Sequence, residues 1–442
     1  MREQGERAGK TMEIRGLSVA VHNLGCKVNA YEAEAMLREL ENAGARIVPW
    51  EERADIYLIN TCSVTELADK KCRTMIRKAA REHPGAFVIV TGCYAQLSPE
   101  EVADIEGVDL VIGAEKKLDL AEYLDLSSSK PSSASIIHSR TKDIRSFRLS
   151  SSSDERTRHF LKVQDGCNYH CTYCTIPKAR GRSRSGSVSE IVAEAERIAS
   201  VGGREIVLTG VNIGDFGRGR GEDFFDLIRA LDEVEGIERF RIGSIEPNLL
   251  SEKIIEYCAH SRRIAPHFHI PLQSGSDEVL RLMKRRYDTE LFRSRVSLIQ
   301  ELLPQAFIGI DVIVGTRGEE ARYFEDCYRF LESIPFSQLH VFSYSEREGT
   351  AALSIDHVVS PQDKHRRSQR LMQLSEERLK AFYRTNLGRE LTVIWEHGNY
   401  NGLMMGHSEN YIRVAQPYDK EAIGTTTRLT PQHLDASGTF VL

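Results

Sequence analysis

The sequence predicts an α/β protein built from three consecutive parts. Strand-like and helix-like segments alternate over residues 15–126, which indicates an N-terminal open parallel α/β domain. Six more strand–helix units follow within residues 154–383. Six units are too few for an eight-stranded barrel, so a partial (β/α)6 barrel is expected. The helical period is lost over residues 384–442, where short strands and turns predict a small all-β barrel.

The bulk composition excludes several classes of protein. With 41% hydrophobic and 28% charged residues, the chain has the make-up of an ordinary soluble protein. It has no run of about 18 apolar residues, so no membrane span is expected. A net charge of −5 argues against a protein coated with nucleic acid but leaves room for a local basic groove. Nine cysteines without a secretory signal predict a reducing, cytoplasmic setting and metal ligands or free thiols.

The N-terminal part places three cysteines at equivalent positions. Its predicted strands cover residues 19–21, 54–59, 86–90 and 108–113, and its predicted helices cover residues 30–43 and 68–81. Cys26, Cys62 and Cys93 each come just past the carboxyl end of a strand, and these ends converge on one edge of an open sheet. We therefore expect a shared three-cysteine site. The alternative is that they are small buried residues. Cys72 lies in the middle of a helix, and we do not expect it to be a ligand.

A serine-rich segment, residues 127–153, follows the N-terminal part. Its polar composition is typical of a linker.

The central part contains six predicted strands and five helices. The strands cover residues 160–163, 205–209, 239–242, 267–272, 309–314 and 339–342, and the helices cover residues 188–200, 223–234, 277–283, 291–303 and 321–331. In such a barrel the active site lies at the carboxyl ends of the strands.

A C-x3-C-x2-C run follows the first of these strands. Cys167, Cys171 and Cys174 can hold three corners of an iron–sulfur cube and leave the fourth iron open for a ligand. Zinc held by these cysteines and His170 is a poorer alternative, because His170 directly precedes Cys171 and neighbouring ligands crowd a tetrahedral metal. A disulfide is disfavoured by the odd cysteine count and the absence of an export signal.

The C-terminal part has short predicted strands over residues 391–395, 403–405, 411–414 and 439–441. Small β-barrels often bind nucleic acid, but the fold alone is weak evidence for that function.

With both cysteine sets placed, the chain resembles the radical SAM methylthiotransferases. The resemblance rests on residues 24–31 (Leu-Gly-Cys-Lys-Val-Asn-Ala-Tyr), 60–65, 91–96, 163–183, 269–276 and 311–315. The first three stretches are similar to the family's N-terminal domain and the others to its radical SAM core. The tail is similar to its RNA-binding TRAM domain. The match covers nearly the whole chain.

Within that family, Gly-Cys-Lys-Val-Asn at residues 25–29 resembles the branch acting on threonylcarbamoyladenosine in tRNA. The resemblance implies an enzyme that adds a methylthio group to C2 of N6-threonylcarbamoyladenosine at tRNA position 37, next to the anticodon. The same chemistry on N6-isopentenyladenosine in tRNA, or on an aspartate of a ribosomal protein, is the enzymatic alternative. An iron–sulfur protein for electron transfer or RNA binding is the non-enzymatic one.

The resemblance also implies the cofactors and partners. The C2–H bond of adenine resists acid–base and nucleophilic chemistry, so a radical cofactor has to act on it. Two [4Fe–4S] clusters are implied: one on Cys167, Cys171 and Cys174, which binds S-adenosylmethionine, and one on Cys26, Cys62 and Cys93, which provides sulfur. The implied partners are a tRNA anticodon stem-loop and a reduced flavodoxin- or ferredoxin-type electron donor. We expect a monomer.

Further contacts to S-adenosylmethionine are expected at strand ends. Ser244 and Glu246 end one strand, Gln273 ends another and Asp311 lies on a third, so barrel geometry lets them face the cofactor. The alternative for Asp311 is an internal ion pair. Glu205 comes shortly after Gly202-Gly203, and we expect it to meet the cofactor's amino group, as the Gly-Gly-Glu element of radical SAM enzymes does.

Four basic residues, Lys178, Arg180, Arg182 and Arg184, follow the cysteine run, and we expect them to contact RNA phosphates. The alternative is a solvated charged surface. The sequence departs from the family pattern twice in strand-end loops. Thr316-Arg317 stands where Phe-Pro is usual, and Ser343 and Glu346-Arg347-Glu348 stand in a stretch usually richer in proline.

Overall fold

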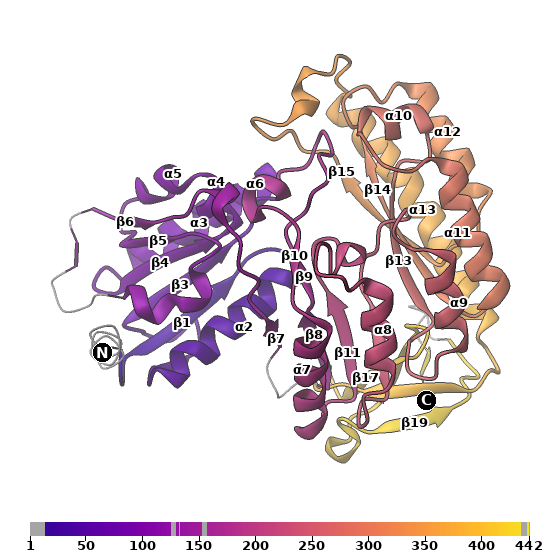
Figure 1. Cartoon of the computed structure of the whole chain (residues 1–442), viewed down its shortest axis with the longest axis horizontal. Helices are drawn as coiled ribbons and strands as arrows, with labels where there is room; N and C mark the ends of the chain where they lie inside the picture. The colour runs from indigo at the N-terminus through magenta and orange to yellow at the C-terminus, as the bar shows by residue number, and fades with distance from the viewer. Residues whose placement is uncertain (1–13, 125–129, 132, 153–156, 435–439, 442) are drawn as a thin grey trace. The chain divides into compact units, whose positions relative to one another are not determined.

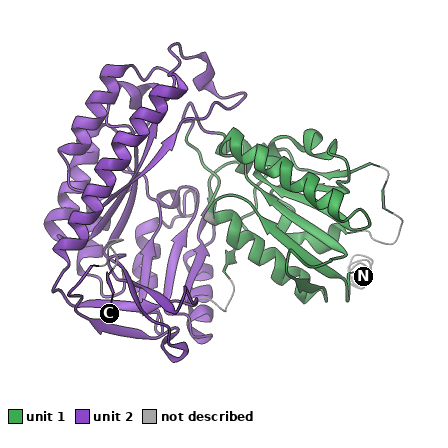
Figure 2. Ribbon diagram, turned by 180° about the vertical axis from the view of Figure 1, so that it is seen from behind, with its two compact units in different colours: residues 1–153, 165–169, 175–184 green, residues 154–164, 170–174, 185–442 purple. Residues whose placement is uncertain are grey.

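The computed structural model describes residues 14–124, 130, 131, 133–152, 157–434, 440 and 441. The chain divides into two compact units (Figures 1 and 2). Unit 1 comprises residues 1–153, 165–169 and 175–184, and unit 2 comprises the remaining residues. Among the described residues, no helix is both long and apolar enough to cross a membrane.

Unit 1 contains a parallel sheet, as the sequence predicts, and the sheet has six strands. Its strands follow the order β2-β1-β3-β4-β5-β6. They are β1 (Ser18–Asn23), β2 (Arg46–Val48), β3 (Ile56–Thr61), β4 (Phe87–Gly92), β5 (Leu110–Ile112) and β6 (Ser135–Ile137). Strands β2 and β6 were not expected. Because β6 comes from the segment predicted to be a linker, that segment contributes to the sheet instead of only connecting two domains.

Helices cover both faces of this sheet. One face packs against α2 (Lys27–Asn42) and the 3-10 helix η1 (Lys117–Tyr123). The other packs against α3 (Glu66–Glu82), α4 (Cys93–Leu97) and α5 (Pro99–Ala103). Helix α3 begins after Thr65, whose side chain accepts a hydrogen bond from the Ala68 N–H and so caps an unpaired helix amide. The result is an α/β/α sandwich whose strands are buried on both faces.

Unit 2 contains the predicted partial barrel. Its six strands are β8 (Arg158–Lys162), β11 (Glu205–Thr209), β12 (Arg239–Ile242), β13 (His267–Gln273), β14 (Phe307–Val314) and β15 (Gln338–Ser343). Two parallel ladders, β12-β11-β8 and β13-β14-β15, are joined by the isolated parallel bridges Phe240–Ile264 and Ser244–His269. The strands therefore follow one another around the partial barrel in chain order.

Helices alternate with these strands (Figure 1). They are α7 (Val188–Ser200), α8 (Phe224–Asp232), α9 (Glu252–His260), α10 (Asp277–Leu282), α11 (Thr289–Leu302) and α12 (Ala321–Glu332). A long helix, α13 (Pro361–Thr385), was not predicted, because its charged composition hides the apolar stripe. It packs on β15, where the Ser375 hydroxyl accepts from the Leu339 N–H at 2.9 Å.

The last part of unit 2 is a five-stranded sheet, consistent with the small β domain expected there. Its order is β19-β16-β17-β18-β20. The strands are β16 (Leu391–Trp395), β17 (Leu403–Ser408), β18 (Arg413–Pro417), β19 (Thr426–Leu429) and β20 (Phe440–Val441). Strand β19 was not predicted, and residue 439 of the last predicted strand lies outside the described residues. Its core gathers around Trp395, Met404 and Phe440.

This C-terminal sheet docks on the amino ends of the barrel strands. Arg239, the first residue of β12, donates to the carbonyl oxygens of Thr392 at 3.1 Å and His407 at 3.0 Å. Arg158, the first residue of β8, lies 3.3 Å from a carboxylate oxygen of Glu396. The carboxyl ends of the strands, where the cysteine loop begins, point the other way.

Candidate active site

The three N-terminal cysteines approach one another because two glycines let their loops pack closely. Cys26 precedes α2, Cys62 follows β3, and Cys93 opens α4 after β4. Gly25 has a φ of 119°, and a Cβ placed there would lie 2.5 Å from the Cβ of Cys62. Gly92 has a φ of 99°, and its Cβ would lie 2.3 Å from a backbone oxygen. Only glycine fits either position, so the local sequence is built for this approach.

The thiols sit in surroundings that differ in burial and charge. Burial raises the pKa of Cys62 to about 11. Burial also raises the pKa of Cys93, while the cations of Arg180 and Lys117 oppose the rise. A metal binds the thiolate and displaces its proton, and nearby cations stabilise the negative charge that results. Cys26 is exposed. Three thiols with nearby cations fit an iron–sulfur cluster that keeps one iron without a protein ligand.

Cys72 packs in the interior of unit 1. It is fully buried in the core of unit 1. Its thiol donates to the backbone oxygen of Cys62 at 3.4 Å and thereby supports the loop that carries Cys62.

Arg180 does not stand where an RNA-contacting residue would. Its guanidinium is buried in unit 1, where it donates to Asn29 Oδ1 at 2.8 Å, to Glu32 Oε2 at 3.0 Å and to Asp165 Oδ1 at 3.0 Å. Lys117 Nζ also donates to Glu32, at 2.5 Å. We expected Arg180 to contact RNA, and the structure contradicts this. The guanidinium N–H groups are buried and already donate to carboxylates.

The other three basic residues of that stretch differ in their exposure to solvent. Lys178 and Arg182 are exposed. Arg184 is mostly buried and donates to Asp165 Oδ2 and to the backbone oxygen of Ser146, each at 2.8 Å. The exposed pair is therefore the part of the predicted basic group that a phosphate can reach.

The second cysteine set lies on the loop that follows β8. Cys167 belongs to unit 1, and its N–H donates to the Gly181 backbone oxygen at 3.0 Å. Cys171 and Cys174 belong to unit 2, where the Cys174 N–H donates to the Cys171 oxygen at 3.1 Å. His170 is exposed. The run thus supplies three thiols from one short stretch of sequence, the donor set that a [4Fe–4S] cluster with one open iron requires.

Arg285 reaches directly to one of these thiols, and the sequence reasoning missed it. Its Nη1 lies 3.1 Å from Cys171 Sγ, and its Nη2 donates to the Glu246 carboxylate. Its Nε donates to the Tyr287 hydroxyl at 3.0 Å. Burial raises the pKa of Cys171 and the guanidinium opposes the rise. A charged donor beside a ligand sulfur is an arrangement that tunes a cluster.

The residues predicted to contact S-adenosylmethionine group at the carboxyl ends, with one exception. Ser244 and Glu246 follow β12, Gln273 ends β13, and Asp311 lies within β14. Gln273 has a φ of 66°, a conformation that side chains other than glycine rarely adopt and that concentrates at ligand sites. Asp311 Oδ1 lies 2.7 Å from His269 Nε2.

Glu205 is the exception. It begins β11, so it lies at the amino ends of the barrel strands, and its buried carboxylate pairs with Arg239 at 2.7 Å and Arg241 at 3.0 Å. The structure thus does not bring it together with the other predicted cofactor contacts. The two glycines before Glu205 do not show which end of the strand the residue occupies.

Comparison with known proteins agrees with this arrangement. Residues 18–113 match the uncharacterized protein family UPF0004, and residues 161–331 match the Radical SAM superfamily. The threonylcarbamoyladenosine tRNA methylthiotransferase MtaB of Bacillus subtilis is 37% identical, with 93% of each chain covered. The protein of the same name from Aquifex aeolicus is also 37% identical, and the alignment covers 93% of this chain and all of that protein. The chain belongs to the threonylcarbamoyladenosine tRNA methylthiotransferases.

This methylthiotransferase is also similar, more distantly, to the enzymes of a neighbouring branch. The tRNA-2-methylthio-N(6)-dimethylallyladenosine synthase of Protochlamydia amoebophila is 31% identical, with 92% of this chain and 91% of that protein covered. Among solved structures, the radical S-adenosylmethionine methyltransferase TsrM of Kitasatospora setae aligns with a TM-score of 0.55 and 14% identity, covering 74% of this chain and 73% of that one. At that identity the likeness concerns the fold alone.

Two further groups in the methylthiotransferase were not foreseen as site residues. His340 lies beside Asp311 on β15, and its ring centroid is 5.1 Å from that of His269. Asn212, after β11, is buried, and neither end of its side-chain amide has a hydrogen-bond partner within the described part of the chain. A buried unpaired amide indicates a ligand. The only signal in the sequence for the two histidines is that His269 and His340 lie at similar distances from the ends of their strands.

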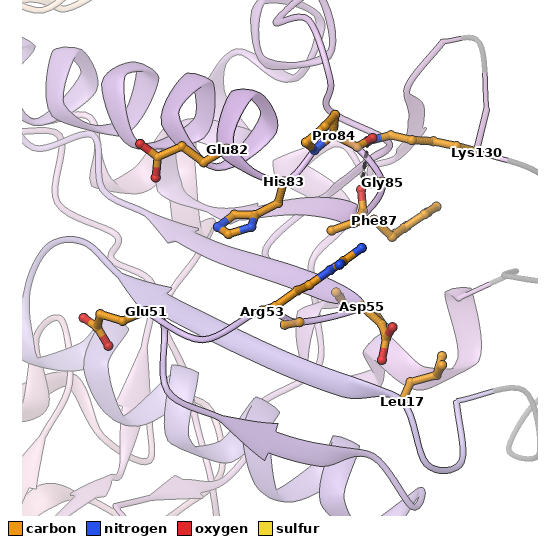
Figure 3. Close-up of a pocket in the computed structure, with 13 residues that line it drawn as sticks. Leu17, Glu51, Arg53, Asp55, Glu82, His83, Pro84, Gly85, Phe87 and Lys130 are labelled. Atoms are coloured by element: carbon orange, nitrogen blue, oxygen red, sulfur yellow. Dashed lines mark hydrogen bonds between the residues drawn. The ribbon is translucent and has the colours of Figure 1, made fainter.

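A hollow in unit 1 lies away from the cysteines. It has a volume of about 620 Å³ and is lined by residues such as Leu17, Asp55 and Ala86, which precede β1, β3 and β4 (Figure 3). Lys130 crosses its rim and donates to the Ala86 oxygen at 2.8 Å. Because Cys26, Cys62 and Cys93 follow the opposite ends of their strands, this hollow is not part of the candidate cluster site.

Proposed function

We propose that the protein adds a methylthio group to C2 of N6-threonylcarbamoyladenosine at position 37 of tRNA, next to the anticodon, by radical SAM chemistry. The observation that carries the proposal is the presence in one chain of two three-cysteine sets, each held on tight loops at strand carboxyl ends. The relatives that share almost the whole length of the chain support the choice of substrate.

Two [4Fe–4S] clusters and S-adenosylmethionine are the cofactors. We assign one cluster to Cys167, Cys171 and Cys174, and the other to Cys26, Cys62 and Cys93. When bound, the first supplies a 5′-deoxyadenosyl radical from S-adenosylmethionine, and the second supplies the sulfur. The protein's part is to hold the ligands. Gly25 and Gly92 admit the close loop packing, Arg180 places a buried cation beside Cys93, and Arg285 does the same beside Cys171.

Contacts to S-adenosylmethionine are proposed for Ser244, Glu246, Gln273 and Asp311. Ser244, Glu246 and Gln273 lie at the carboxyl ends of β12 and β13, and Asp311 lies in the carboxyl half of β14; these positions and the left-handed backbone of Gln273 support this role. We add Asn212, whose unpaired buried amide needs a partner that offers both a donor and an acceptor. Glu205 is left out, because its carboxylate is paired with Arg239 and Arg241 at the other end of the barrel.

For the tRNA, Lys178 and Arg182 are proposed as phosphate contacts to the anticodon stem-loop, because they are exposed and follow the cysteine loop. A reduced flavodoxin or ferredoxin is the proposed electron donor. A tRNA substrate places the reaction in the cytoplasm, and a monomer is the proposed state.

Nucleoside analysis tests the substrate. In tRNA from a strain lacking the gene, mass spectrometry should show threonylcarbamoyladenosine without its 2-methylthio derivative, and a plasmid copy should restore the derivative. Loss of 2-methylthio-isopentenyladenosine instead would overturn the substrate assignment and favour the neighbouring branch. A non-enzymatic iron–sulfur protein would change neither nucleoside, and it would release no 5′-deoxyadenosine with dithionite and S-adenosylmethionine.

The division of labour between the two cysteine sets is tested by substitution. Cys26→Ala should keep S-adenosylmethionine cleavage, abolish methylthiolation and halve the iron content from about eight to about four per chain. Cys171→Ala should abolish both activities. Cys258→Ala is the matched control, because Cys258 is buried in α9 and serves only packing. Equal loss of cleavage in the Cys26 and Cys171 variants would contradict the assignment.

A further inference from the structure

We propose that Phe342 and the cluster His269, Asp311 and His340 form a binding site for the unpaired purine of the RNA substrate. Phe342 would stack on the base, and the polar cluster would form hydrogen bonds with it. This inference rests on the proposed function, because it assigns the target base to a place in the barrel.

The polar cluster is formed by three neighbouring strands. His269 comes from β13, Asp311 from β14 and His340 from β15, and Asp311 and His340 are paired in the ladder. One nitrogen or oxygen from each side chain lies within 4.8 Å of the others. All three side chains are half-buried. They are therefore close enough to act on one small group and open enough to reach it.

A glycine lies next to the polar cluster and lets the two imidazoles approach the sheet. Gly309 is the ladder partner of His269 on β14. A Cβ at Gly309 would lie 3.7 Å from His340 Nε2 and 3.9 Å from His269 Cδ2. The nearest heavy atom would be Cε1 of Phe307, at 3.2 Å, so a side chain larger than a methyl group at this position would collide with Phe307 or with the two imidazoles.

Phe342 stands over the same face, nearer the carboxyl ends. Side chains alternate along a strand, so Phe342 and His340 point to the same side of β15. Their ladder partners, Ile313 and Asp311, share a face in the same way. Phe342 is 53% exposed, whereas the aromatic residues of the core are buried. An exposed phenyl ring above a polar cluster, on the active side of the barrel, offers an apolar plane with hydrogen-bonding groups beneath it.

This combination matches the chemistry of an unpaired base. Proteins that read single-stranded RNA stack bases on aromatic side chains and bind their edges through hydrogen bonds. A purine edge presents ring-nitrogen acceptors, which a neutral or protonated imidazole can donate to. Asp311, bonded to His269, fixes the orientation of that ring. The carboxylate of the threonylcarbamoyl group adds a further acceptor for an imidazole N–H.

Fluorescence of 2-aminopurine tests the site without any turnover. The full-length protein is titrated with an anticodon stem-loop RNA that carries 2-aminopurine at the target position, whose emission falls when it stacks. Wild type should quench the emission. Phe342→Leu should abolish the quenching and weaken binding by about tenfold, while Phe342→Trp should retain both. His340→Ala should weaken binding and leave S-adenosylmethionine binding unchanged. Met372→Ala, at a 51% exposed position on α13, is the control and should match wild type.

Two results would overturn the site. One is quenching by Phe342→Leu equal to that of wild type, with an unchanged melting temperature to show that the variant is folded. The other is quenching that occurs only when Zn²⁺ is added, because the cluster would then be a metal site. Either failure is distinct from failure of the proposed function, which the nucleosides of the deletion strain report.

Discussion

Arg317 Nε donates to Glu346 Oε1 at 2.6 Å, and this contact joins the loops that follow β14 and β15. Both residues stand where the sequence departs from the usual pattern of its family, Arg317 in place of a proline and Glu346 in a stretch usually rich in proline. Proline restricts a loop through its ring. Here the ion pair between the two loops restricts them in place of proline. The two departures from the family pattern therefore belong together, because each supplies one partner of the ion pair.

Removing Arg317 should loosen the loops more than removing Glu346. The Arg317 guanidinium also donates from Nη1 to the backbone oxygens of Leu353 at 2.9 Å and Ile355 at 3.3 Å. Arg317→Ala therefore frees three acceptors, whereas Glu346→Gln removes one charge. Hydrogen exchange measured by mass spectrometry should be faster over residues 344–356 in Arg317→Ala and little changed in Glu346→Gln. Equal exchange in the two variants would show that the ion pair alone holds the loops.

Glu205 should be essential for stability. Burial raises its pKa, but Arg241 and Arg239 outweigh that effect and hold the pKa of Glu205 well below its usual range. Glu205→Gln leaves two buried guanidinium groups without their charge partner and should cost about 3–5 kcal/mol in the free energy of unfolding. The exposed Glu238, which pairs with Arg204 at 3.7 Å, is the control, and Glu238→Gln should cost little.

The pH dependence of that effect has a defined sign. A carboxylate whose pKa is lower in the folded state contributes stability above its unfolded pKa of about 4, and loses it as the pH falls toward the folded pKa. The wild-type melting temperature should therefore fall below pH 4 more steeply than that of Glu205→Gln. Parallel curves would mean that other carboxylates dominate acid unfolding.

Unlike Glu205, Glu39 should lower the stability of the folded protein as the pH rises. Burial raises its pKa to about 7, and the charges of Asp119 and Glu122 add to the rise, while the Ala121 N–H opposes it. A carboxyl group with a raised folded pKa stabilises below its unfolded pKa and loses that contribution as the pH rises toward 7. Glu39→Gln should thus stabilise the protein by about 1 kcal/mol at pH 8, after allowance for solvent screening, and have little effect at pH 4.

Melting temperatures at pH 4 and pH 8 check this prediction. Glu41→Gln, at an exposed position on the same helix α2, is the control. A gain of stability that is the same at both pH values would mean that the amide acts through packing and not through the charge of Glu39.

Arg285 should raise the reduction potential of the cluster held by Cys171. Hydrogen bonds to ligand sulfurs are among the factors that set the potential of an iron–sulfur cluster, and a positive donor favours the reduced, more negative state. Arg285→Gln should therefore shift the midpoint potential, measured by electron paramagnetic resonance during a redox titration, to a more negative value. Arg281→Gln is the control, because Arg281 is exposed on α10. An unchanged potential would limit Arg285 to a packing role.

The order of strands could be predicted from the sequence because apolar runs and helical periods are local signals. Residues 56–59 and 206–209 are continuous runs of apolar or β-branched residues, and both lie in buried strands. Strand β6 and helix α13 were missed because serine-rich and charged compositions conceal them. Their formation depends on pairing with β5 and packing on β15, which are contacts between distant parts of the chain.

The candidate site could be predicted where spacing alone defines the chemistry. Cys167, Cys171 and Cys174 were identified as candidate cluster ligands from an eight-residue pattern. The environment of Arg180 could not be predicted in that way, because its partners Asn29 and Glu32 lie about 150 residues earlier in the chain. A run of basic residues is the same in sequence whether its members face solvent or a buried carboxylate, so the interpretation as an RNA contact was wrong for Arg180.

The docking of the C-terminal sheet on the barrel has a consequence for synthesis of the chain. Arg241 donates to the backbone oxygens of Ser408 and Glu409, in the last tenth of the sequence. Until that segment has left the ribosome, the guanidinium of Arg241 on β12 lacks these two acceptors. The barrel therefore cannot complete its packing during translation, and iron–sulfur assembly on a nascent chain would start from a core that is still open at one end.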